Sequence, residues 1–308
     1  MKMTNWLVIG IGDISRKRVI PAIQSEPRSR LHSILTRDPA KARDYPEAHI
    51  YTDLEDALNN RSVDAVYVAT PVSMHATQAI AALKKGKHVL CEKPAALDLA
   101  DAVRMKEAAD ESGKLLGIAY YRRLFPKLID AKRRIEAGEM GTPVLAEANC
   151  HGWLPPESRG WLIDPQMAGA GPLYDIACHR IDAINFLFGA PARVVGLTSN
   201  VVHQTAVEDS ATMIIDYVKG PRGVVDVRWN SRIERDQFRV IGTAGEIDLS
   251  PLSGEAHANV HYPLIENFVS ACIGETELVC PMKESLKTDR VLQAVRFGEP
   301  LQGRGLTG

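Results

Sequence analysis

Short apolar runs alternate with segments of helical periodicity through residues 1–120, a pattern that predicts repeated βαβ units and a parallel sheet. The run at residues 65–69 is apolar throughout, as is typical of a strand that is covered on both faces. Right-handed crossovers would wind such strands into an open, doubly wound sheet. We expect strands at residues 6–10, 31–35, 65–69, 88–91 and 115–119, and helices at residues 15–25, 53–59, 74–85 and 99–112.

The pattern changes after residue 120. A loop rich in Trp, Pro and Gly spans residues 153–171, and from residue 192 to residue 249 alternating runs are broken by Gly-containing turns, which predicts an antiparallel or mixed sheet with one open face. We expect strands at residues 143–150, 194–198, 211–217, 223–229 and 238–241, and helices at residues 126–137, 172–187, 263–272 and 284–297. The sequence therefore predicts an α/β protein with one domain over residues 1–120, a second over residues 121–308 and a frayed tail at residues 303–308.

Composition excludes several classes of function for this chain of 308 residues. Lys and Arg total 37 against 38 for Asp and Glu, so no basic excess is present to bind nucleic acid or an anionic membrane surface. No run approaches the ~18 apolar residues of a membrane span, and the first residues lack the apolar core of a signal peptide. The five cysteines are scattered without a Cys-x-x-Cys pair, which argues against a disulfide framework or a zinc knuckle. We therefore expect a cytoplasmic protein.

A glycine-rich turn follows the first expected strand. Its sequence, Gly10-Ile11-Gly12-Asp13-Ile14-Ser15, has the form Gly-x-Gly-x-x-small and leads into a helix. In a dinucleotide-binding turn the first glycine permits the tight turn, the second lets the backbone approach a pyrophosphate, and the small third residue lets helix and strand pack closely. The positive helix N-terminus would hold the pyrophosphate. The alternative is a turn that binds nothing, and the strand-turn-helix context favours the dinucleotide.

The end of the second strand bears on the choice of cofactor. An NAD site needs an acidic side chain there for the ribose 2′-hydroxyl, whereas an NADP site needs a cation. Thr36 stands where the acid would be and Arg37 follows it, and a guanidinium can hold a 2′-phosphate and stack on adenine. Asp38 leaves an alternative open, because it could be the missing acid or the N-cap of a helix that starts at Pro39. The pattern favours NADP over NAD.

The strand at residues 65–69 is followed by Thr70, Pro71 and His75, at the edge where such sheets bind ligands. Thr70 could donate a hydrogen bond to a cofactor phosphate or ribose. Alternatively, Thr70 and His75 could only cap the next helix.

Glu92, Lys93 and Pro94 follow the strand at residues 88–91 at the same edge. A lysine held beside a nicotinamide can hydrogen-bond a substrate hydroxyl, and burial would lower its pKa toward a range suited to proton transfer. Elsewhere a Glu-Lys pair is most often solvated surface charge. The position at a strand end favours the functional interpretation.

A third set of residues lies on the helix expected at residues 172–187. Asp175 and His179 are four residues apart and share one helix face, with Asp182 further along it. A histidine there can act as an acid or base whose orientation is set by a carboxylate or a substrate hydroxyl. The alternatives are an ordinary pair on an exposed helix, or a metal site, for which the sequence offers no third ligand. We expect no metal.

These three elements together resemble the family of glucose–fructose oxidoreductase, inositol dehydrogenase and the rhizopine-catabolism oxidoreductases (Gfo/Idh/MocA). The resemblance rests on Gly10-x-Gly12, Glu92-Lys93-Pro94 and Gly169-x-Gly171-x-x-x-Asp175-x-x-x-His179, and it extends to residues 121–126, 161–165 and 267–269. It implies a Rossmann domain followed by an α/β domain with an open, largely antiparallel sheet, which commonly assembles homodimers or homotetramers. It also implies reversible hydride transfer between NAD(P) and a hydroxyl or carbonyl carbon of a sugar, polyol or diol.

By this resemblance Lys93, Asp175 and His179 form the catalytic set. His179 would exchange a proton with the substrate oxygen, Lys93 would polarise that oxygen and contact the nicotinamide ribose, and Asp175 would orient the substrate. Whether Lys93 or His179 is the acid or base stays open. The chain departs from the family pattern at Ser15 and at Ala170, which interrupts a common Gly-Gly-Gly run, and both residues are still small.

Aromatic faces suit the C–H surfaces of a sugar, and guanidinium or imidazole groups suit its hydroxyls. The substrate candidates, besides Asp175 and His179, are Tyr121, Arg122, His151, Trp153, Arg159 and Trp161. Trp161 could instead belong to the core, and Arg122 could hold the cofactor amide or pair with Glu92. The cofactor candidates are Gly10, Gly12, Asp13, Ile14, Ser15, Thr36, Arg37, Thr70, Pro71, His75, Glu92, Lys93 and Arg122.

Two rival functions stand beside a dehydrogenase or reductase. One is a glycoside-cleaving enzyme of the same family that keeps NAD bound and uses transient oxidation. The other is a sensor that binds the dinucleotide without turnover. The presence of Lys93, Asp175 and His179 argues against the sensor, which has no reason to keep all three.

Overall fold

The computed structural model describes residues 3–158, 160–253 and 259–301. The chain forms two compact units, and each is made of two stretches of sequence. The first unit holds Met1–Tyr121 and His257–Glu284, and the second holds Arg122–Ala256 and Ser285–Gly308. The boundary expected after residue 120 puts residues 257–284 in the second domain, whereas they belong to the first unit. The tail expected at residues 303–308 lies outside the described residues.

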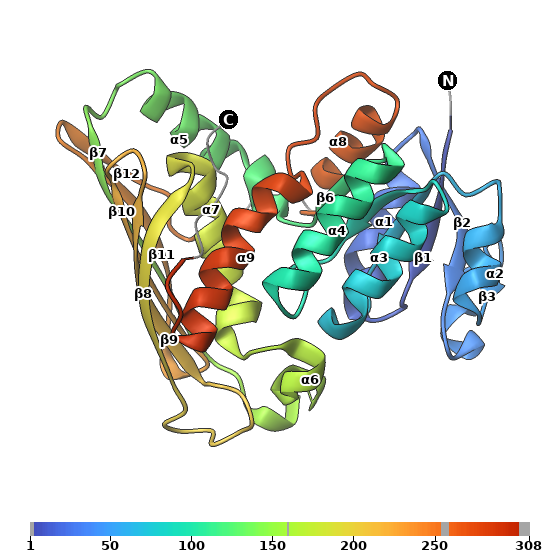
Figure 1. Ribbon diagram of the computed structural model, residues 1–308, viewed down its shortest axis with the longest axis horizontal. Coiled ribbons are helices and arrows are strands. Elements are labelled where there is room, and N and C mark those ends of the chain that lie inside the picture. Colours follow the sequence, from blue (N-terminus) through green and yellow to red (C-terminus); the bar gives the residue numbers. More distant parts are fainter. Residues whose placement is uncertain (1–2, 159, 254–258, 302–308) are drawn as a thin grey trace. The chain divides into compact units, whose positions relative to one another are not determined.

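A parallel sheet forms the middle of the first unit, with the strand order β3-β2-β1-β4-β5-β6 (Figure 1). Its central strands are buried on both faces, which explains their continuous apolar sequence and confirms the predicted parallel sheet. The strands are β1 (Thr4–Ile9), β2 (Ser29–Leu35), β3 (His49–Tyr51), β4 (Ala65–Val68), β5 (His88–Cys91) and β6 (Leu116–Ile118). The short strand β3 was not predicted, because its side chains are largely exposed and show no apolar pattern.

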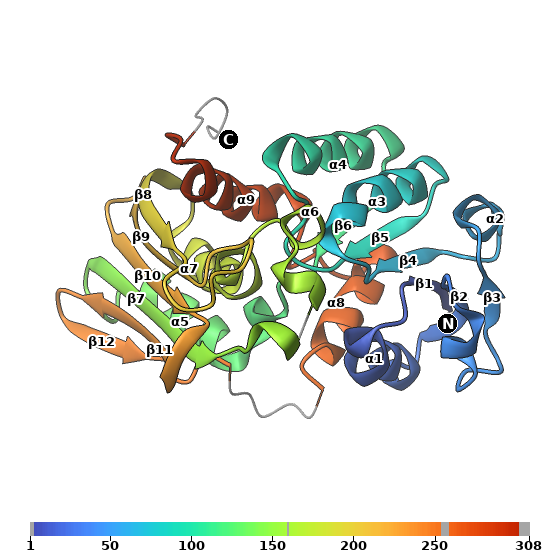
Figure 2. The same cartoon turned by 90° about the horizontal axis from the view of Figure 1, so that it is seen from below.

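Helices cover both faces of this sheet, with α3 and α4 on one face and α1 and α8 on the other (Figure 2). Their ends follow sequence signals: the Asp98 carboxylate accepts a hydrogen bond from the N–H of Asp101 where α4 begins, and Gly113 ends α4 in the left-handed conformation. The helices of this unit are α1 (Ile20–Ser25), α2 (Leu54–Asn59), α3 (His75–Lys84), α4 (Leu99–Ser112) and α8 (Tyr262–Cys272), with the short turns η1 (Ser15–Val19), η2 (Pro39–Ala42) and η3 (Val72–Met74).

Residues 259–284, which we call the returning segment, rejoin the first unit after the chain has built most of the second. The Phe268 ring of α8 lies 5.3 Å from the Trp6 ring of β1, centroid to centroid. Three polar contacts anchor the rest of the segment: Asn259 Nδ2 to Arg18 O at 2.8 Å, Arg28 Nη1 to Glu275 Oε2 at 2.7 Å, and Ile118 N to Cys280 O at 3.0 Å. The segment is therefore an integral part of the unit that carries the parallel sheet.

A mixed sheet forms the second unit, with the strand order β12-β11-β7-β10-β9-β8. Strands β7 and β10 pair in parallel and the other neighbours are antiparallel, which confirms the largely antiparallel sheet. The strands are β7 (Pro143–Trp153), β8 (Pro191–Ser199), β9 (Ser210–Tyr217), β10 (Arg222–Arg228), β11 (Asn230–Gly242) and β12 (Gly245–Asp248). Strand β11 is longer than predicted, because its first half is polar and carries no alternating apolar signal.

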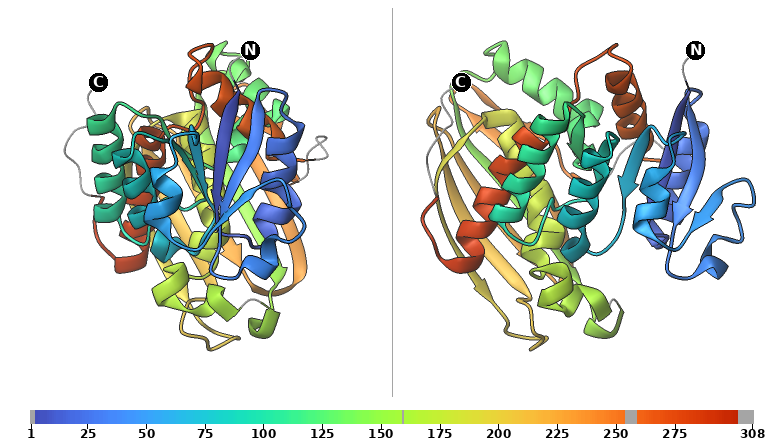
Figure 3. Two further views of the ribbon diagram at one scale, coloured as in Figure 1. Left: turned by 90° about the vertical axis from the view of Figure 1, so that its right-hand side faces the viewer. Right: turned by 45° about the vertical axis from the view of Figure 1, so that its right-hand side comes forward.

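The helix α7 and much of α9 pack on one face of this sheet, and no helix of the described residues covers the other face (Figures 1 and 3). The remaining helices and turns are α5 (Pro126–Glu136), α6 (Pro165–Ala168), α7 (Cys178–Phe188), α9 (Met282–Phe297), η4 (Tyr121–Leu124), η5 (Pro156–Ser158), η6 (Gly160–Ile163) and η7 (Leu173–Ala177). Within the described part of the chain, none of the helices is long and apolar enough to cross a bilayer.

A buried ion pair fixes α7 within the second unit. Arg123 of η4 donates from Nε and Nη2 to the two carboxylate oxygens of Asp182 at 2.9 and 2.7 Å, and the two side chains are only 3% and 2% exposed. The hydroxyl of Thr288 in α9 lies 3.5 Å from the same carboxylate. The two hydrogen bonds compensate for the loss of water around both charges. Since they form only when the Asp182 side chain points at Arg123, they also fix the rotation of α7 about its axis.

Replacing Asp182 by Asn should lower the free energy of unfolding by about 3–5 kcal/mol, because Arg123 would keep a buried charge without its carboxylate. Urea denaturation measures this loss. Asp101→Asn, which removes a carboxylate paired with the exposed Arg104, is the matched control and should change stability little. The double variant Arg123→Met/Asp182→Leu should recover much of the loss. An Asp182→Asn protein as stable as the Asp101→Asn control would contradict this account.

Candidate active site

The loops that carry the predicted cofactor residues leave the parallel sheet at one edge, after the carboxyl ends of β1, β2, β4 and β5. Backbone bonds extend the sheet just beyond these strands: Gly10 N to Leu35 O at 3.0 Å, Ala69 N to Ile9 O at 2.8 Å, and Glu92 N to Val68 O at 2.9 Å. These bonds fix where each loop begins. In doubly wound sheets a ligand binds at this edge, where the strand order reverses, here between β1 and β4.

Gly10 occupies a position that only glycine can fill. Its φ is +91°, and an added Cβ would lie 2.8 Å from the Ala69 carbonyl oxygen. Ser15, which replaces the usual third small residue, is buried, and its hydroxyl donates to Gly10 O at 2.7 Å. The serine therefore closes the turn with a hydrogen bond that glycine or alanine could not make.

Gly12 is not explained by packing within the protein, because an added Cβ would meet no atom within 4 Å. Helical backbone follows over residues 13–25 and includes the π-helical turn η1. An open glycine at the start of a helix is the cradle that suits a pyrophosphate. The Asp13 carboxylate pairs with Lys17 at 2.7 Å, which leaves its backbone N–H as the group it would offer to a ligand. The residues present therefore fit a dinucleotide.

The loop after β2 assigns a structural role to Asp38. Its Oδ1 accepts a hydrogen bond from Ala40 N at 3.0 Å, as the N-cap of η2. Thr36 is buried, and its hydroxyl accepts from Asp38 N at 3.2 Å. Arg37 is exposed, and among the described residues its guanidinium has no hydrogen bond or ion pair. The exposed Arg37 side chain thus places a positive charge at this strand end, while the neighbouring Asp38 carboxylate accepts a backbone hydrogen bond.

His75 joins two of these loops. Its Nδ1 lies 3.0 Å from Pro94 O and its Nε2 lies 2.9 Å from Thr70 O, and burial lowers its pKa. The Thr70 hydroxyl in turn donates to Gln78 Oε1 at 2.7 Å. His75, predicted to bind the cofactor, therefore has both ring nitrogens against carbonyl oxygens of the loops that carry Thr70 and Pro94.

Glu92 lies in a buried cluster at the end of β5. Its Oε1 accepts a hydrogen bond from Tyr67 Oη at 2.7 Å, and its Oε2 accepts from the backbone N of Lys93 at 3.3 Å. Burial raises the pKa of Glu92, but the contact with His261, the hydrogen bond from Tyr67 and the charge of Lys93 outweigh burial, so the pKa lies below its ordinary value. Burial and the nearby Glu92 charge raise the pKa of Tyr67 well above 10, so the phenol remains a donor.

His261, the residue just before α8, was not predicted as a site residue. Its ring is buried against Tyr121, with centroids 4.8 Å apart, and its Nε2 lies 3.5 Å from Glu92 Oε1. Local sequence carries no signal for this placement, since it depends on the path of the returning segment. Half-buried Lys93 and Tyr121 border the same cluster, and the Lys93–Pro94 peptide is cis.

The second unit carries Asp175 and His179 on adjoining turns. Asp175 lies in η7, a π-helical turn that runs into α7, and His179 lies in the first turn of α7. The sequence predicted a continuous α-helix here, whereas a π turn is a local widening that is frequent at functional sites. His179 is 6% exposed and Asp175 is half-buried, so the two are not a solvated pair on an exposed helix. In the described residues no cluster of three His, Cys, Asp or Glu side chains could hold a metal ion.

The glycines before Asp175 have a packing role. An added Cβ on Gly171 would lie 2.0 Å from Glu208 O, and Glu208 Oε1 accepts from Leu173 N at 3.0 Å. Burial raises the pKa of Glu208. The loop that presents Asp175 is therefore fixed by direct contact with Glu208.

Two arginines, Arg122 and Arg180, lie near Cys150 inside the second unit. Arg180, whose side chain is 1% exposed, donates from Nη2 to Asp236 Oδ1 at 2.6 Å. Burial raises the pKa of the Cys150 thiol, and the charges that act on it belong to Arg180, Asp236, Arg122 and Asp175. Arg122, predicted to bind cofactor or substrate, is buried, and its charge acts on the Cys150 thiol and on the Asp236 carboxylate.

His151 does not lie with Asp175 and His179. Its Nε2 contacts Asp226 Oδ2 at 2.6 Å. In β10 the buried residues Val225 and Val227 face the helices, and Asp226, which lies between them, faces the opposite side of the sheet. His151 therefore belongs to the open face of the sheet, opposite α7. Its predicted place in the substrate site is not supported, because the face on which a strand residue lies depends on register and not on residue type.

Two aromatic substrate candidates, Trp153 and Trp161, lie in the second unit. Trp161, in η6, is 43% exposed and so is not a core residue. Trp153, at the end of β7, lies under the Arg232 guanidinium at 4.1 Å, and the His203 ring meets it in an edge-to-face contact. Arg159 lies outside the described residues.

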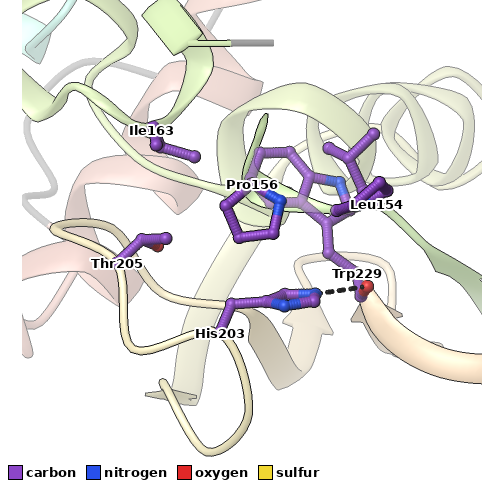
Figure 4. Close-up of a pocket in the computed structure, with 7 residues that line it drawn as sticks. Leu154, Pro156, Ile163, His203, Thr205 and Trp229 are labelled. Carbon is purple, nitrogen blue, oxygen red and sulfur yellow. Dashed lines mark hydrogen bonds between the residues drawn. The ribbon is translucent and has the colours of Figure 1, made fainter. Parts of the chain in front are cut away.

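A small hollow lies beneath this loop region (Figure 4). Its walls come from Leu154, Pro155, Pro156, Ile163, His203, Thr205 and Trp229. Its free volume is about 10 Å³, room for roughly one water molecule, so it does not fit a sugar. The His203 ring lies 2.9 Å from Trp229 O across the hollow, and the residues around it form a local apolar core beneath the loop.

Comparisons with known proteins agree with this architecture. Residues 4–120 match the family described as "Oxidoreductase family, NAD-binding Rossmann fold", and residues 128–248 match the "GFO/IDH/MocA C-terminal domain". The chain is 32% identical over 250 residues to a 1,5-anhydro-D-fructose reductase of Ensifer adhaerens, covering 80% of this chain and 75% of that protein. It is 29% identical over 248 residues to a D-xylose 1-dehydrogenase (NADP(+)) of Haloferax volcanii, covering 79% and 75% of the two chains.

Among solved structures, the WlbA dehydrogenase from Bordetella pertussis in complex with NADH and UDP-GlcNAcA has a similar fold. The TM-score is 0.88, with 23% sequence identity over 97% of both chains. At this identity the likeness concerns the fold alone. The named cofactors differ among these proteins, NADP(+) in one and NADH in the other.

Gly10 and Gly12 should respond differently to alanine. Gly10→Ala should lower the free energy of unfolding by about 1–3 kcal/mol through its positive φ and the Ala69 contact. Gly12→Ala should leave stability near wild type but weaken NADPH binding at least about tenfold, because the Cβ takes the space of the pyrophosphate. Denaturation and fluorescence titration measure the two effects.

Gly113→Ala is the matched control, since its φ is also positive but no atom lies near the added Cβ and the residue ends α4. It should lose some stability and keep its affinity for NADPH. A Gly12→Ala protein that binds NADPH as tightly as wild type would argue against a pyrophosphate at this turn.

Proposed function

This chain belongs to the Gfo/Idh/MocA family and is an NAD(P)-binding oxidoreductase, and we propose that its substrate is a sugar, polyol or related diol. A hydroxyl or carbonyl carbon of that substrate would exchange a hydride with the nicotinamide ring. The names of the relatives support this class, since they act on an anhydro sugar and on xylose. The observation that carries the proposal is the convergence of Gly12, Arg37 and Lys93 on the carboxyl edge of one parallel sheet.

The dinucleotide would lie along that edge, from β2 past β1 to β5. The open backbone at Gly12 and the N–H groups of Asp13, Ile14 and Ser15 would hold the pyrophosphate. Thr70 and Pro71 would border the nicotinamide ribose.

We propose that NADP is preferred over NAD. Arg37 has no competing partner among the described residues, and Asp38 is engaged as an N-cap, so a 2′-phosphate would meet a cation and no free carboxylate.

The proposed catalytic set is Lys93, Asp175 and His179. The bound cofactor supplies the hydride acceptor or donor. Lys93 would donate a hydrogen bond to the reacting substrate oxygen, and Asp175 would accept one from a neighbouring hydroxyl. His179 would take the hydroxyl proton during oxidation and return it during reduction. The buried position of His179 and the π turn at Asp175 support a role for these groups beyond surface charge.

We propose that the open face of the second sheet binds a second copy of the chain, giving a homodimer or homotetramer. Val195 and Leu197 of β8 and Ile214 of β9 are 65%, 78% and 46% exposed, and Val195 pairs directly with Ile214. Apolar side chains gathered on an uncovered sheet face mark an interaction surface. Light scattering of the wild type and of Leu197→Glu tests the assignment.

We also propose that the protein works in the cytoplasm on its small-molecule substrate. All five cysteines are free thiols, and Cys91, Cys178 and Cys280 are buried. Thiols persist in a reducing compartment. Neither nucleic acid nor a membrane surface is expected as a partner at a net charge of −1.

Replacing Arg37 by Ala should raise the dissociation constant for NADPH far more than that for NADH, because only NADPH carries the 2′-phosphate. Fluorescence titration with both dinucleotides measures the ratio. Arg30→Ala removes an exposed arginine near the start of β2, away from the carboxyl end that precedes Arg37. It is the control and should change neither constant. Equal losses of affinity for NADPH and NADH would exclude Arg37 as the 2′-phosphate site.

A substrate panel read by NADPH absorbance tests the activity, with polyols and aldoses for oxidation and with ketoses, osones and diketones for reduction. On the best substrate, His179→Ala should lower kcat by about 10²-fold or more, as the loss of a proton-transfer group does. The exposed His49 of β3 provides the control variant His49→Ala. An unchanged kcat with chemistry rate-limiting removes His179 from the mechanism, and cleavage of aryl glycosides without net NADPH turnover would favour the glycoside-cleaving alternative.

A further inference from the structure

His261 is a buried imidazole that the proposed mechanism does not use. Its residue is 1% exposed, and by normal hydrogen-bond geometry neither ring nitrogen has a partner in the described residues. Burying an imidazole without partners is unfavourable, so its place in the cluster calls for an explanation. Its nearest charged group is the Glu92 carboxylate, with Nε2 3.5 Å from Oε1.

The position of His261 is fixed from several sides. Its backbone N donates to Asn259 Oδ1 at 3.0 Å, and Asn259 Nδ2 donates to Arg18 O in the turn after the glycine loop. Its ring packs against Tyr121, and α8 is held to the sheet through Phe268. The contacts of the returning segment with the rest of the first unit therefore hold the His261 imidazole next to Glu92.

Glu92 is the link between His261 and Lys93. One carboxylate oxygen receives the Tyr67 hydroxyl and faces His261, and the other receives the backbone N–H of Lys93. The carboxylate thus fixes the backbone from which the Lys93 side chain departs. A change in its orientation or charge would displace that lysine.

We propose that His261 is a positioning residue for Lys93, acting through Glu92: from the returning segment it offers a second side-chain donor beside Tyr67 and keeps the carboxylate ionised and oriented. This inference rests on the proposed function, in which Lys93 binds the reacting oxygen. The other ionisable groups that face Glu92 and Tyr67 are Cys91 at the end of β5, Lys93 just after it, His75 of α3 and Tyr121 of η4. His261 is the neighbour whose contact favours the ionised form of Glu92 most.

Two substitutions of His261 distinguish the effect of its N–H donor from the effect of its ring packing. His261→Phe keeps an aromatic ring against Tyr121 and removes the N–H, whereas His261→Gln can keep a donor near the Nε2 position. His32→Phe is the matched control, because His32 is another histidine of the first unit, in ring contact with His49 and away from this cluster.

The pH profile of kcat/KM is the first readout. If Lys93 is held in place only while Glu92 is ionised, kcat/KM falls as the pH drops through the Glu92 pKa, in addition to any fall caused by His179. The pKa of Glu92 is depressed in the folded protein and losing the donor raises it, so this Glu92 part of the acid limb should move upward by about one unit in His261→Phe. The limb should stay near wild type in His261→Gln and in His32→Phe. The dissociation constant for NADPH should change less than about twofold in all three variants, since none of them touches the pyrophosphate turn.

The titration of Glu92 itself is the second readout and needs no activity. Carbon-13 NMR of glutamate-labelled protein, with the resonance assigned by Glu92→Gln, should show the Glu92 pKa raised in His261→Phe and not in His261→Gln. If His261→Phe does not fold, the reciprocal measurement decides: Glu92→Gln changes the acceptor that the His261 ring faces, so it should shift the ring NMR resonances of His261 and leave those of His32 unchanged.

A Glu92 titration that is the same in His261→Phe and wild type overturns the inference. So does a shifted titration with an unmoved acid limb, because His261 would then act on Glu92 without affecting Lys93. If the wild-type protein turns over no sugar or polyol, the proposed function fails, and the Glu92 titration alone then decides whether His261 acts on that carboxylate.

Discussion

The second unit depends on an ion pair that water does not reach. Arg123 and Asp182 bind through two parallel hydrogen bonds, and Thr288 brings α9 to the same carboxylate. A pair in this environment is tolerated only when its geometry is nearly ideal, because both charges have lost their hydration. The ion pair thereby restrains the rotation of α7. Because His179 lies three residues before Asp182 on the same helix, this restraint also sets the direction in which the His179 side chain points. The Asp175 loop is fixed separately, by Gly171 against Glu208.

In the first unit, by contrast, hydrogen bonds position the polar groups. Backbone hydrogen bonds continue past the strand ends, and side-chain hydrogen bonds then connect the loops to one another. Ser15 closes the glycine turn, His75 joins the loops after β4 and β5, and Tyr67 holds Glu92. Each of these groups is satisfied within the protein. Among the described residues, Gly12 and Arg37 remain open at the edge, and a dinucleotide would contact both.

The sequence predicted the parallel sheet because its central strands are apolar on both faces, and the glycine turn because strand, glycines and helix follow one another within a few residues. Features that depend on distant pairing were not predictable. His151 lies on the open sheet face because of the register between β7 and β10, and His261 reaches Glu92 because the chain returns after the second sheet. The π turns at Ser15–Val19 and Leu173–Ala177 have no local residue signal, and β11 is polar through half its length.

The interruption of the first unit has a consequence for how a ribosome makes this protein. Synthesis at about 5–20 residues per second separates residue 121 from residue 259 by roughly 7–28 s, and throughout that time Trp6 has no Phe268 to cover it. Residues 1–121 therefore remain an incomplete unit with exposed apolar surface until the following residues have been synthesised. A chaperone that shields this flank during translation would matter more here than for a unit encoded by one uninterrupted stretch.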